Sequence, residues 1–214
     1  MVRASRGVER RRSTRLPLAV PIFVRGVDEN GKEFLEFTTA FNISASGSLL
    51  ATRRYLPRGS HVSLEIPAVP LPAPVDFVQN VKAQVVQVSH SERFHLCRLK
   101  NEKKIVRRRR READRRRWER LPLAIPVFAR GLDEDGKEFV EFTNAFNVNA
   151  GGALLATRRY LAPASQISLE VASAPVPRQP LVPHFIRTLR AKVIRGGESN
   201  GCHLSSLRFA RPIL

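Results

Sequence analysis

The chain contains one long internal repeat, and this repeat constrains the fold more than any other feature of the sequence. Residues 15–56 align without a gap to residues 120–161 at a constant offset of 105, and 31 of these 42 positions are identical. The offset is far longer than a solenoid period, and each copy has the size of a small domain. The sequence therefore predicts a first domain with an N-terminal arm at residues 1–100, a connector at residues 101–119 and a second domain at residues 120–214.

Positive charge is concentrated in two arginine-rich segments. The formal net charge is +18, of which residues 1–15 carry +5 and residues 100–120 carry +8. The repeated bodies are therefore only mildly basic. Such a distribution indicates an anionic partner, for example a nucleotide, a nucleic acid, or an acidic protein or membrane surface. The alternative is a solvated basic segment that binds no ligand.

Cysteine usage and hydropathy indicate the compartment. Cys97 and Cys202 do not occupy equivalent positions in the two copies, which argues against a disulfide framework. An apolar run follows the basic N-terminus, but the same run recurs at Leu121–Ala129 inside the chain, so we interpret it as the start of a strand and not as an export signal. No run approaches the roughly 20 apolar residues needed to span a bilayer. We therefore expect a cytoplasmic protein without a membrane span.

Each copy shows the pattern of about six short strands. The Asn-Gly pair at the end of Asp28–Gly31 predicts a hairpin turn, and the prolines in residues 67–76 exclude a central strand there. The expected strands of the first copy are Leu18–Val27, Lys32–Ser44, Ser48–Arg54, Val62–Ile66, Val78–Val88 and Phe94–Leu99. Since no helix separates them, we predict an all-β fold of two tandem six-stranded antiparallel barrels. The connector, at Asn101–Trp118, is the one helix candidate because it is rich in Lys, Arg, Glu and Ala.

The end of the second expected strand carries a polar pattern. Regular alternation would place Phe41 and Ile43 on the core face and would place Asn42 and Ser44 together on the outer face. Gly47 follows where we expect the chain to turn sharply.

Two motifs recur in both copies. One is an arginine pair with three intervening residues, just ahead of the first strand, and the other is Asn-x-Ser-x-x-Gly at the end of the second. The positions are Arg11, Arg15, Asn42, Ser44 and Gly47 in the first copy, and Arg116, Arg120, Asn147, Asn149 and Gly152 in the second. In this order, and in six-stranded barrels, the motifs resemble those of the PilZ domain family, bacterial receptors for the second messenger cyclic di-GMP.

The resemblance implies a binding and signalling module whose ligand is cyclic di-GMP. Arg11 and Arg15 would grip guanine and phosphate, while Asn42 and Ser44 would supply hydrogen bonds and Gly47 would allow a close backbone approach. The residue types suit this chemistry, because arginine can fork onto guanine O6 and N7, clamp a phosphate or stack on a base. Ligand binding would order the arginine segments and change the orientation of the barrels.

The second copy departs from the motif. Asn149 stands where the motif has serine and Gly151 replaces Ser46, so the second site is weakened, altered or lost. Two other functions stay open: a nucleic-acid-binding protein whose arginine runs track phosphates, and a pair of barrels that acts only as a protein adaptor. The histidines lack metal-ligand spacing, and no catalytic motif is present. We expect no enzyme activity, no metal and no cofactor; the downstream partner protein is unknown.

Overall fold

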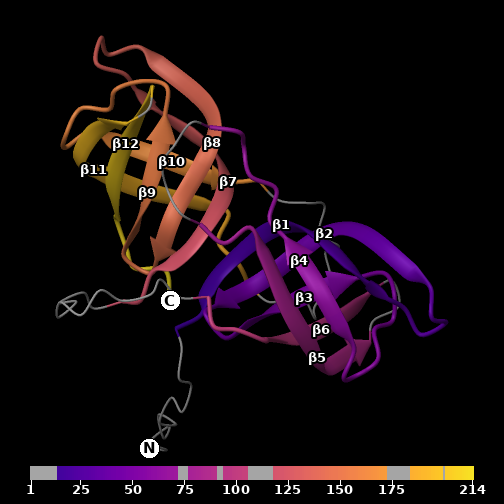
Figure 1. Cartoon of the computed structure of the whole chain (residues 1–214). Helices are drawn as coiled ribbons and strands as arrows, with labels where there is room; N and C mark the ends of the chain where they lie inside the picture. Colours follow the sequence, from indigo (N-terminus) through magenta and orange to yellow (C-terminus); the bar gives the residue numbers. More distant parts are fainter. Residues whose placement is uncertain (1–13, 72–76, 91–93, 106–117, 173–183, 200) are drawn as a thin grey trace, which may run out of the picture.

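The computed structural model of the chain describes residues 14–71, 77–90, 94–105, 118–172, 184–199 and 201–214. These residues form two closed barrels of antiparallel strands (Figure 1). The first barrel is closed in the order β1–β2–β3–β6–β5–β4 and the second in the order β7–β8–β9–β12–β11–β10. The strands of the first barrel are β1 (Leu16–Val27), β2 (Glu33–Ser44), β3 (Gly47–Thr52), β4 (His61–Glu65), β5 (Asn80–His90) and β6 (His95–Asn101). Those of the second are β7 (Leu121–Leu132), β8 (Glu138–Asn149), β9 (Gly152–Thr157), β10 (Gln166–Val171), β11 (Thr188–Ser199) and β12 (Cys202–Phe209). The predicted all-β class and the six strands per barrel are confirmed.

The expected helix at Asn101–Trp118 is not supported. Asn101 ends strand β6, residues 102–105 and 118–120 are irregular, and residues 106–117 lie outside the described part of the chain. The amide of Ile105 donates to the carbonyl of Ala45, 2.9 Å away, and the Ile105 side chain is buried against the barrel core. These contacts hold residues 102–105 against the barrel in a non-helical conformation. Ile213 makes the same hydrogen bond to Ala150 in the second barrel.

The first half of β1 has a sheet neighbour on one side only. Strand β1 pairs with β2 along most of its length, whereas its pairing with β4 covers only the stretch from Phe23 to Gly26. Pro17 and Pro21 lie in the half without a second neighbour, where the missing N–H of proline costs no ladder hydrogen bond. Strand β7 repeats this arrangement, since its pairing with β10 begins only at Val127.

Each open edge is covered by the other barrel. The amide of Ile186, which precedes β11, donates to the carbonyl of Pro17 at 2.7 Å, and Leu18 and Ile186 form a parallel bridge. In the reverse direction, the amide of Val78 donates to the carbonyl of Pro122 at 2.6 Å. We call this reciprocal contact the clasp. It protects two strand edges that would otherwise be open to pairing with other chains.

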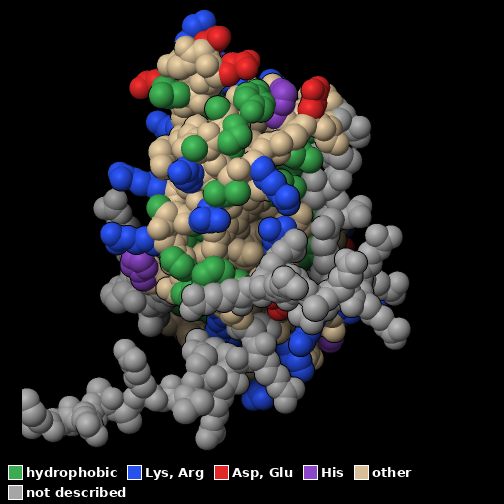
Figure 2. Space-filling model, turned by 90° about the vertical axis from the view of Figure 1, so that its left-hand side faces the viewer, with side chains coloured by type: hydrophobic (Ala, Val, Ile, Leu, Met, Phe, Trp, Pro, Cys, Tyr) green, Lys and Arg blue, Asp and Glu red, His purple; other side chains and the backbone are tan. Residues whose placement is uncertain are grey.

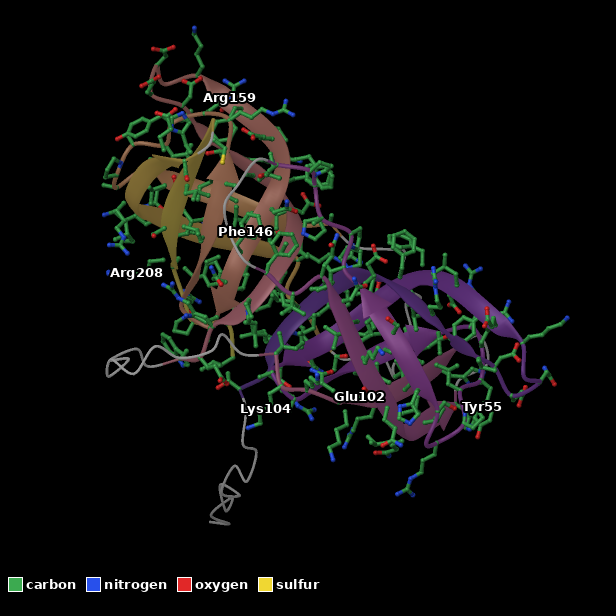
Figure 3. The ribbon with its side chains drawn as sticks, viewed as in Figure 1. Tyr55, Glu102, Lys104, Phe146, Arg159 and Arg208 are labelled. Carbon is green, nitrogen blue, oxygen red and sulfur yellow. The ribbon has the colours of Figure 1, made fainter. Side chains whose placement is uncertain are left out.

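Aromatic side chains complete the clasp with the same approximate two-fold symmetry. The rings of Phe41 and Phe185 lie 5.4 Å apart, and those of Phe77 and Phe146 lie 5.5 Å apart. Figure 3 shows Phe146 on the side of the second barrel that faces the first. Asn144 of the second barrel adds two hydrogen bonds to the first: its Nδ2 donates to the Val69 carbonyl at 2.7 Å, and its Oδ1 accepts from the Val69 amide at 3.0 Å.

Phe41 is fully buried, as predicted, but the prediction that it shares one face with Ile43 is wrong. Ala40 and Ile43 lie in the core cluster, whereas Phe41 belongs to a separate cluster that Phe185 of the second barrel covers. A register shift between Phe41 and Ser44 interrupts the alternation at Asn42. A β-bulge of this kind re-aims the side chains that follow it, so simple period-two counting fails here. In the described residues, no helix is long and apolar enough to cross a membrane.

Candidate functional site

The two motif asparagines share an unusual backbone conformation. Asn42 has φ of 49° and Asn147 has φ of 50°, both in the left-handed region. Asparagine tolerates this region better than most residues with a side chain. Because both copies keep the conformation, the bulge and its asparagine form one local unit that occurs twice.

Strand register brings the arginine segment to this bulge. Leu16 pairs with Ile43, and Leu121 pairs with Val148. Ile43 and Val148 are the second residues of the two motifs, directly after the asparagine. Arg15 and Arg120, one residue earlier, therefore lie beside the two motifs; Arg15 is partly buried and Arg120 is exposed. The other predicted arginines, Arg11 and Arg116, lie outside the described residues.

The structure does not place Ser44 on the outer face beside Asn42. Ser44 is buried, and its hydroxyl donates to the carbonyl of Gly47 at 2.9 Å. The bulge is again the reason, since it turns Ser44 inward. The Ser44 hydroxyl thus holds the motif loop in shape and keeps its lone pairs as acceptors.

Gly47 is required for packing and not for a special turn. It does not have a positive φ, in contrast to Gly31 and Gly59. A Cβ atom on Gly47 would lie 2.1 Å from the carbonyl oxygen of Leu99 on the neighbouring strand β6. Gly152 meets the Leu207 carbonyl at the same distance. The motif glycine therefore lets strand β3 lie close to strand β6. The close backbone approach that the sequence predicted at Gly47 is thus an approach to the protein's own backbone.

The loop of the second copy has different hydrogen bonds. The side-chain oxygen of Asn149 accepts a hydrogen bond from the backbone amide of Gly151 at 2.8 Å. The Asn149 side chain therefore holds this loop, as the Ser44 hydroxyl holds the loop of the first copy. Asn147 is buried, and its Oδ1 atom has no hydrogen-bond partner among the described residues. A buried acceptor without a partner is costly, which makes this atom a candidate for binding a ligand donor.

Two cations beside the motifs were not predicted from the sequence. Lys100 is the cross-strand neighbour of Gly47, and Arg208 is the cross-strand neighbour of Gly152. Both are exposed, and Figure 3 shows Arg208 at the end of the second barrel opposite to Arg159. The two residues are equivalent at an offset of 108, and this retained charge is the signal that could have identified them. On the face shown in Figure 2, Lys and Arg side chains are spread among hydrophobic ones.

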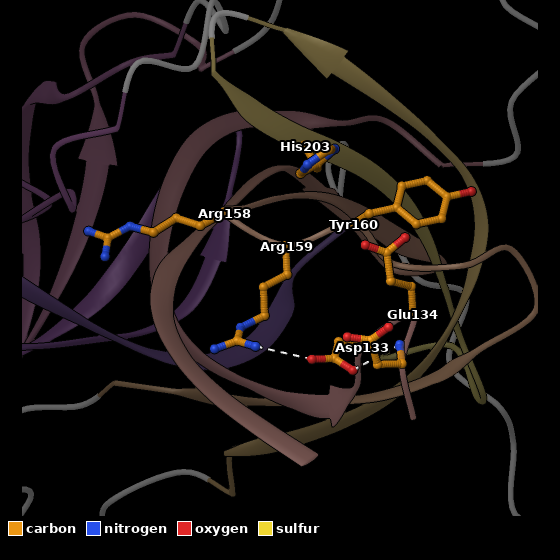
Figure 4. A pocket seen from close by; sticks show the side chains of 7 residues that line it. Asp133, Glu134, Arg158, Arg159, Tyr160 and His203 are labelled. Atoms are coloured by element: carbon orange, nitrogen blue, oxygen red, sulfur yellow. Dashed lines mark hydrogen bonds and ion pairs between the residues drawn. The ribbon is translucent and has the colours of Figure 1, made fainter. Parts of the chain in front are cut away.

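A separate pocket lies at the far end of the second barrel (Figure 4). It has a volume of about 610 Å³ and is lined by Asp133, Glu134, Asp135, Arg158, Arg159, Tyr160 and His203. Arg159 is paired with Asp133 at 3.1 Å. The backbone amides of Lys137 and Asp135 donate to the Asp133 carboxylate and hold its pKa below the usual value, and Arg159 adds to the effect. The three acidic side chains make this pocket a poor place for phosphates.

The cysteines and histidines of the described residues form no metal site or reactive centre. No group of three or more His, Cys, Asp or Glu residues could hold a metal ion in this part of the chain. Cys97 and Cys202 are free and buried, and burial raises the pKa of the Cys97 thiol to about 12. A thiol with so high a pKa is a poor nucleophile near neutral pH.

Part of the chain is similar to a known protein family. The family model described as the PilZ domain matches residues 9–111, which include the whole motif of the first copy. Similar solved structures include the Bacillus subtilis inhibitor of motility MotI/DgrA, with 14% identity, coverage of 91% of this chain and 89% of that chain, and a TM-score of 0.33. MrkH of K. pneumonia in its apo state has 15% identity over 90% and 78%, with a TM-score of 0.31. YcgR from Escherichia coli in complex with c-di-GMP has 14% identity over 89% and 76%, also with a TM-score of 0.31. No curated protein sequence gives a match.

Proposed function

We propose that this chain is a receptor for cyclic di-GMP in bacterial signalling, because the PilZ domain family model matches residues 9–111. The family match carries the proposal, because it covers the barrel in which the motif Arg11, Arg15, Asn42, Ser44 and Gly47 is complete. The chain is then a binding module and not an enzyme, and it acts through a downstream protein.

The geometry of the motif supports a dianionic purine ligand. Arg15 lies beside the bulge through the pairing of Leu16 with Ile43, and Lys100 lies across from Gly47. Two cations at one loop suit the two phosphates of the ligand, and the guanidinium can also fork onto guanine O6 and N7. Asn42 presents an amide at the bulge, where its oxygen and nitrogen can accept from and donate to a guanine edge. In this proposal Ser44 and Gly47 hold the loop, and Arg11 closes over the ligand from the N-terminal arm.

The second copy offers a related site with a different loop. Arg120, Asn147, Asn149 and Gly152 occupy the equivalent positions, and Arg208 replaces Lys100. The buried Oδ1 atom of Asn147 needs a donor, and the N1–H and amino groups of guanine are donors of the right kind. We therefore propose that the second site also binds, with Arg116 supplied by the connector.

The clasp gives a route from ligand to barrel orientation. Pro17 is two residues after Arg15, and its carbonyl holds Ile186 of the second barrel. Pro122 is two residues after Arg120, and its carbonyl holds Val78 of the first barrel. Ordering of either arginine by a ligand therefore acts directly on a residue of the clasp. Small-angle scattering with and without ligand tests this step. A ligand that binds without changing the scattering curve would contradict it.

Nucleic-acid binding is the competing function, because the two arginine-rich segments carry most of the net charge. Competition for a labelled cyclic di-GMP probe separates the two functions. A dinucleotide site should keep its affinity at moderate salt and should not release the probe to GTP. Phosphate tracking through six to ten contacts should instead lose about 10³- to 10⁵-fold between 50 and 200 mM salt. Displacement of the probe by single-stranded DNA as readily as by unlabelled ligand would favour nucleic acid. No binding of either would favour a protein adaptor.

A further inference from the structure

The connector places a tryptophan directly on the second motif loop. A Cβ atom on Gly151 would lie 2.6 and 2.8 Å from two carbon atoms of the Trp118 ring, which is closer than non-bonded carbons approach. The indole therefore packs against the bare backbone of Gly151. Trp118 is half-buried and packs on the apolar core cluster, so the residue is held on the barrel while part of it stays accessible.

Trp118 and Gly151 replace two serines of the first copy together. Ser13 and Ser46 stand at the equivalent positions, at the offset of 105. A side chain at position 151 would collide with the indole in its present position, so this placement of Trp118 depends on glycine at 151. The change from Ser46 to Gly151 is thus explained by Trp118 and is not a sign of a decaying motif.

The surroundings of the indole suit a purine base. Trp118 lies in sequence between Arg116 and Arg120, the arginine pair of the second motif. The loop beneath it is held by the hydrogen bond from the Gly151 amide to Asn149, and the same motif contains the buried acceptor Oδ1 of Asn147. An aromatic face, a purine-matching acceptor and a cation are the three elements that bind a nucleotide base and its phosphate.

We propose that Trp118 is a ligand-contacting residue of the second site, where its indole stacks on a guanine of the ligand. This inference rests on the proposed function and deepens it, because it makes the second site an aromatic variant of the first instead of a weakened copy. The two sites then recognise the same ligand by different contacts: a polar loop surface at Ser46 and an indole at Trp118.

The experiment uses the fact that Trp118 is the only tryptophan of the chain. Its fluorescence therefore reports the second site alone, while calorimetry on the same full-length protein counts all sites. Titration with cyclic di-GMP should quench Trp118 emission with a saturable dependence, because a stacked guanine quenches indole. Trp118→Ser should weaken the second site roughly tenfold or more and leave the first unchanged. Trp118→Phe, which keeps an aromatic face, should retain most of the affinity.

A second pair of variants separates contact from folding. Gly151→Ser should displace the indole, shift its emission to longer wavelength and weaken the second site. Trp118→Ser/Gly151→Ser restores the serine pair of the first copy, and its unfolding transition should match that of the wild type. Heat of binding with no change in Trp118 emission would overturn this inference and leave the proposed function standing. So would tighter binding by Trp118→Ser, since the indole would then block the site. Absence of any binding heat would contradict the proposed function itself.

Discussion

The amide of Ile186 in the second barrel donates a hydrogen bond of 2.7 Å to the carbonyl of Pro17 in the first. Val78 and Pro122 repeat this bond in the opposite direction, so two barrels of one chain hold each other as the subunits of a two-fold dimer would. The bonds fall on strand halves that lack a second neighbour. They also fall two residues after Arg15 and Arg120, which links the clasp to both candidate sites.

The Asn144 side chain is the first test of the clasp. Asn144→Thr introduces the residue that the first copy has at the same position, Thr39, and removes both hydrogen bonds to Val69. Because the Val69 amide and carbonyl then lose their partners, the free energy of unfolding should fall by about 1–3 kcal/mol. Urea denaturation measures this. Asn30→Asp, in an exposed turn where the second copy has Asp135, is the control and should change stability by no more than about 0.5 kcal/mol.

Gly47→Ala should destabilise the first barrel. Its Cβ would lie 2.1 Å from the Leu99 carbonyl oxygen, and a backbone atom in a closed barrel cannot move aside cheaply. We expect a loss of about 2–3 kcal/mol, measured by thermal or urea unfolding. Gly197→Ala, in strand β11 with open space around the new Cβ, should be near neutral. Equal stability of the two variants would show that the motif glycine serves the ligand and not the barrel.

Substitutions of Asn42 should separate backbone strain from ligand contact. At φ of 49°, Asn42→Gly keeps the bulge without strain, whereas Asn42→Ala should cost about 1 kcal/mol of stability. Both variants lack the amide, so both should bind cyclic di-GMP about tenfold more weakly. Unfolding curves and ligand titrations on the same samples provide the comparison. Full affinity in Asn42→Gly would remove Asn42 from the site.

Acid should destabilise the first barrel through a histidine pair. The Nδ1 atoms of His90 and His95 lie 3.1 Å apart, and burial, with the charge of His90 as a second cause, lowers the pKa of His95. The unfolded chain therefore binds more protons than the folded one below about pH 6.5, and stability should decrease as the pH falls through that value. Unfolding midpoints between pH 8 and pH 5 measure the effect. His90→Glu, which introduces the residue of the second copy, Glu198, should reduce the acid-induced loss or reverse it.

The barrels could be predicted from the sequence because the patterns that indicate their strands and turns are local and occur in both copies. Alternating apolar residues and the Asn-Gly turn identify strands such as β1 and β2 without knowledge of their partners. The prediction failed where a long-range contact or a bulge decides the outcome. Phe41 has the hydropathy of a core residue, and only its contact with Phe185 reveals that it faces the other barrel.

The motif residues were identified from the sequence, but their geometry was not, and their role in binding stays a prediction. Asn42 and Ser44 were identified from their spacing, yet the left-handed φ of Asn42 turns Ser44 inward. The strand alternation used for the prediction assumes a regular strand and therefore misses this turn. The connector was predicted as a helix from residue propensities, but its described residues 102–105 and 118–120 are irregular, and Ile105 is bonded to Ala45 of the barrel. Lys100, Arg208 and Trp118 were not predicted to lie beside the motifs, because pairing across strands or packing on Gly151 places them there.

Calorimetric titration of the full-length chain with cyclic di-GMP tests the central claim most directly. We expect saturable binding that GTP does not mimic. Arg15→Ala should lose at least about tenfold in affinity at the first site, since one charged bidentate contact contributes about 1–3 kcal/mol. Arg53→Ala, at an exposed arginine beyond the end of strand β3, is the matched control and should bind as the wild type does. A titration without heat in the wild type, or equal affinities for Arg15→Ala and the wild type, would contradict the account.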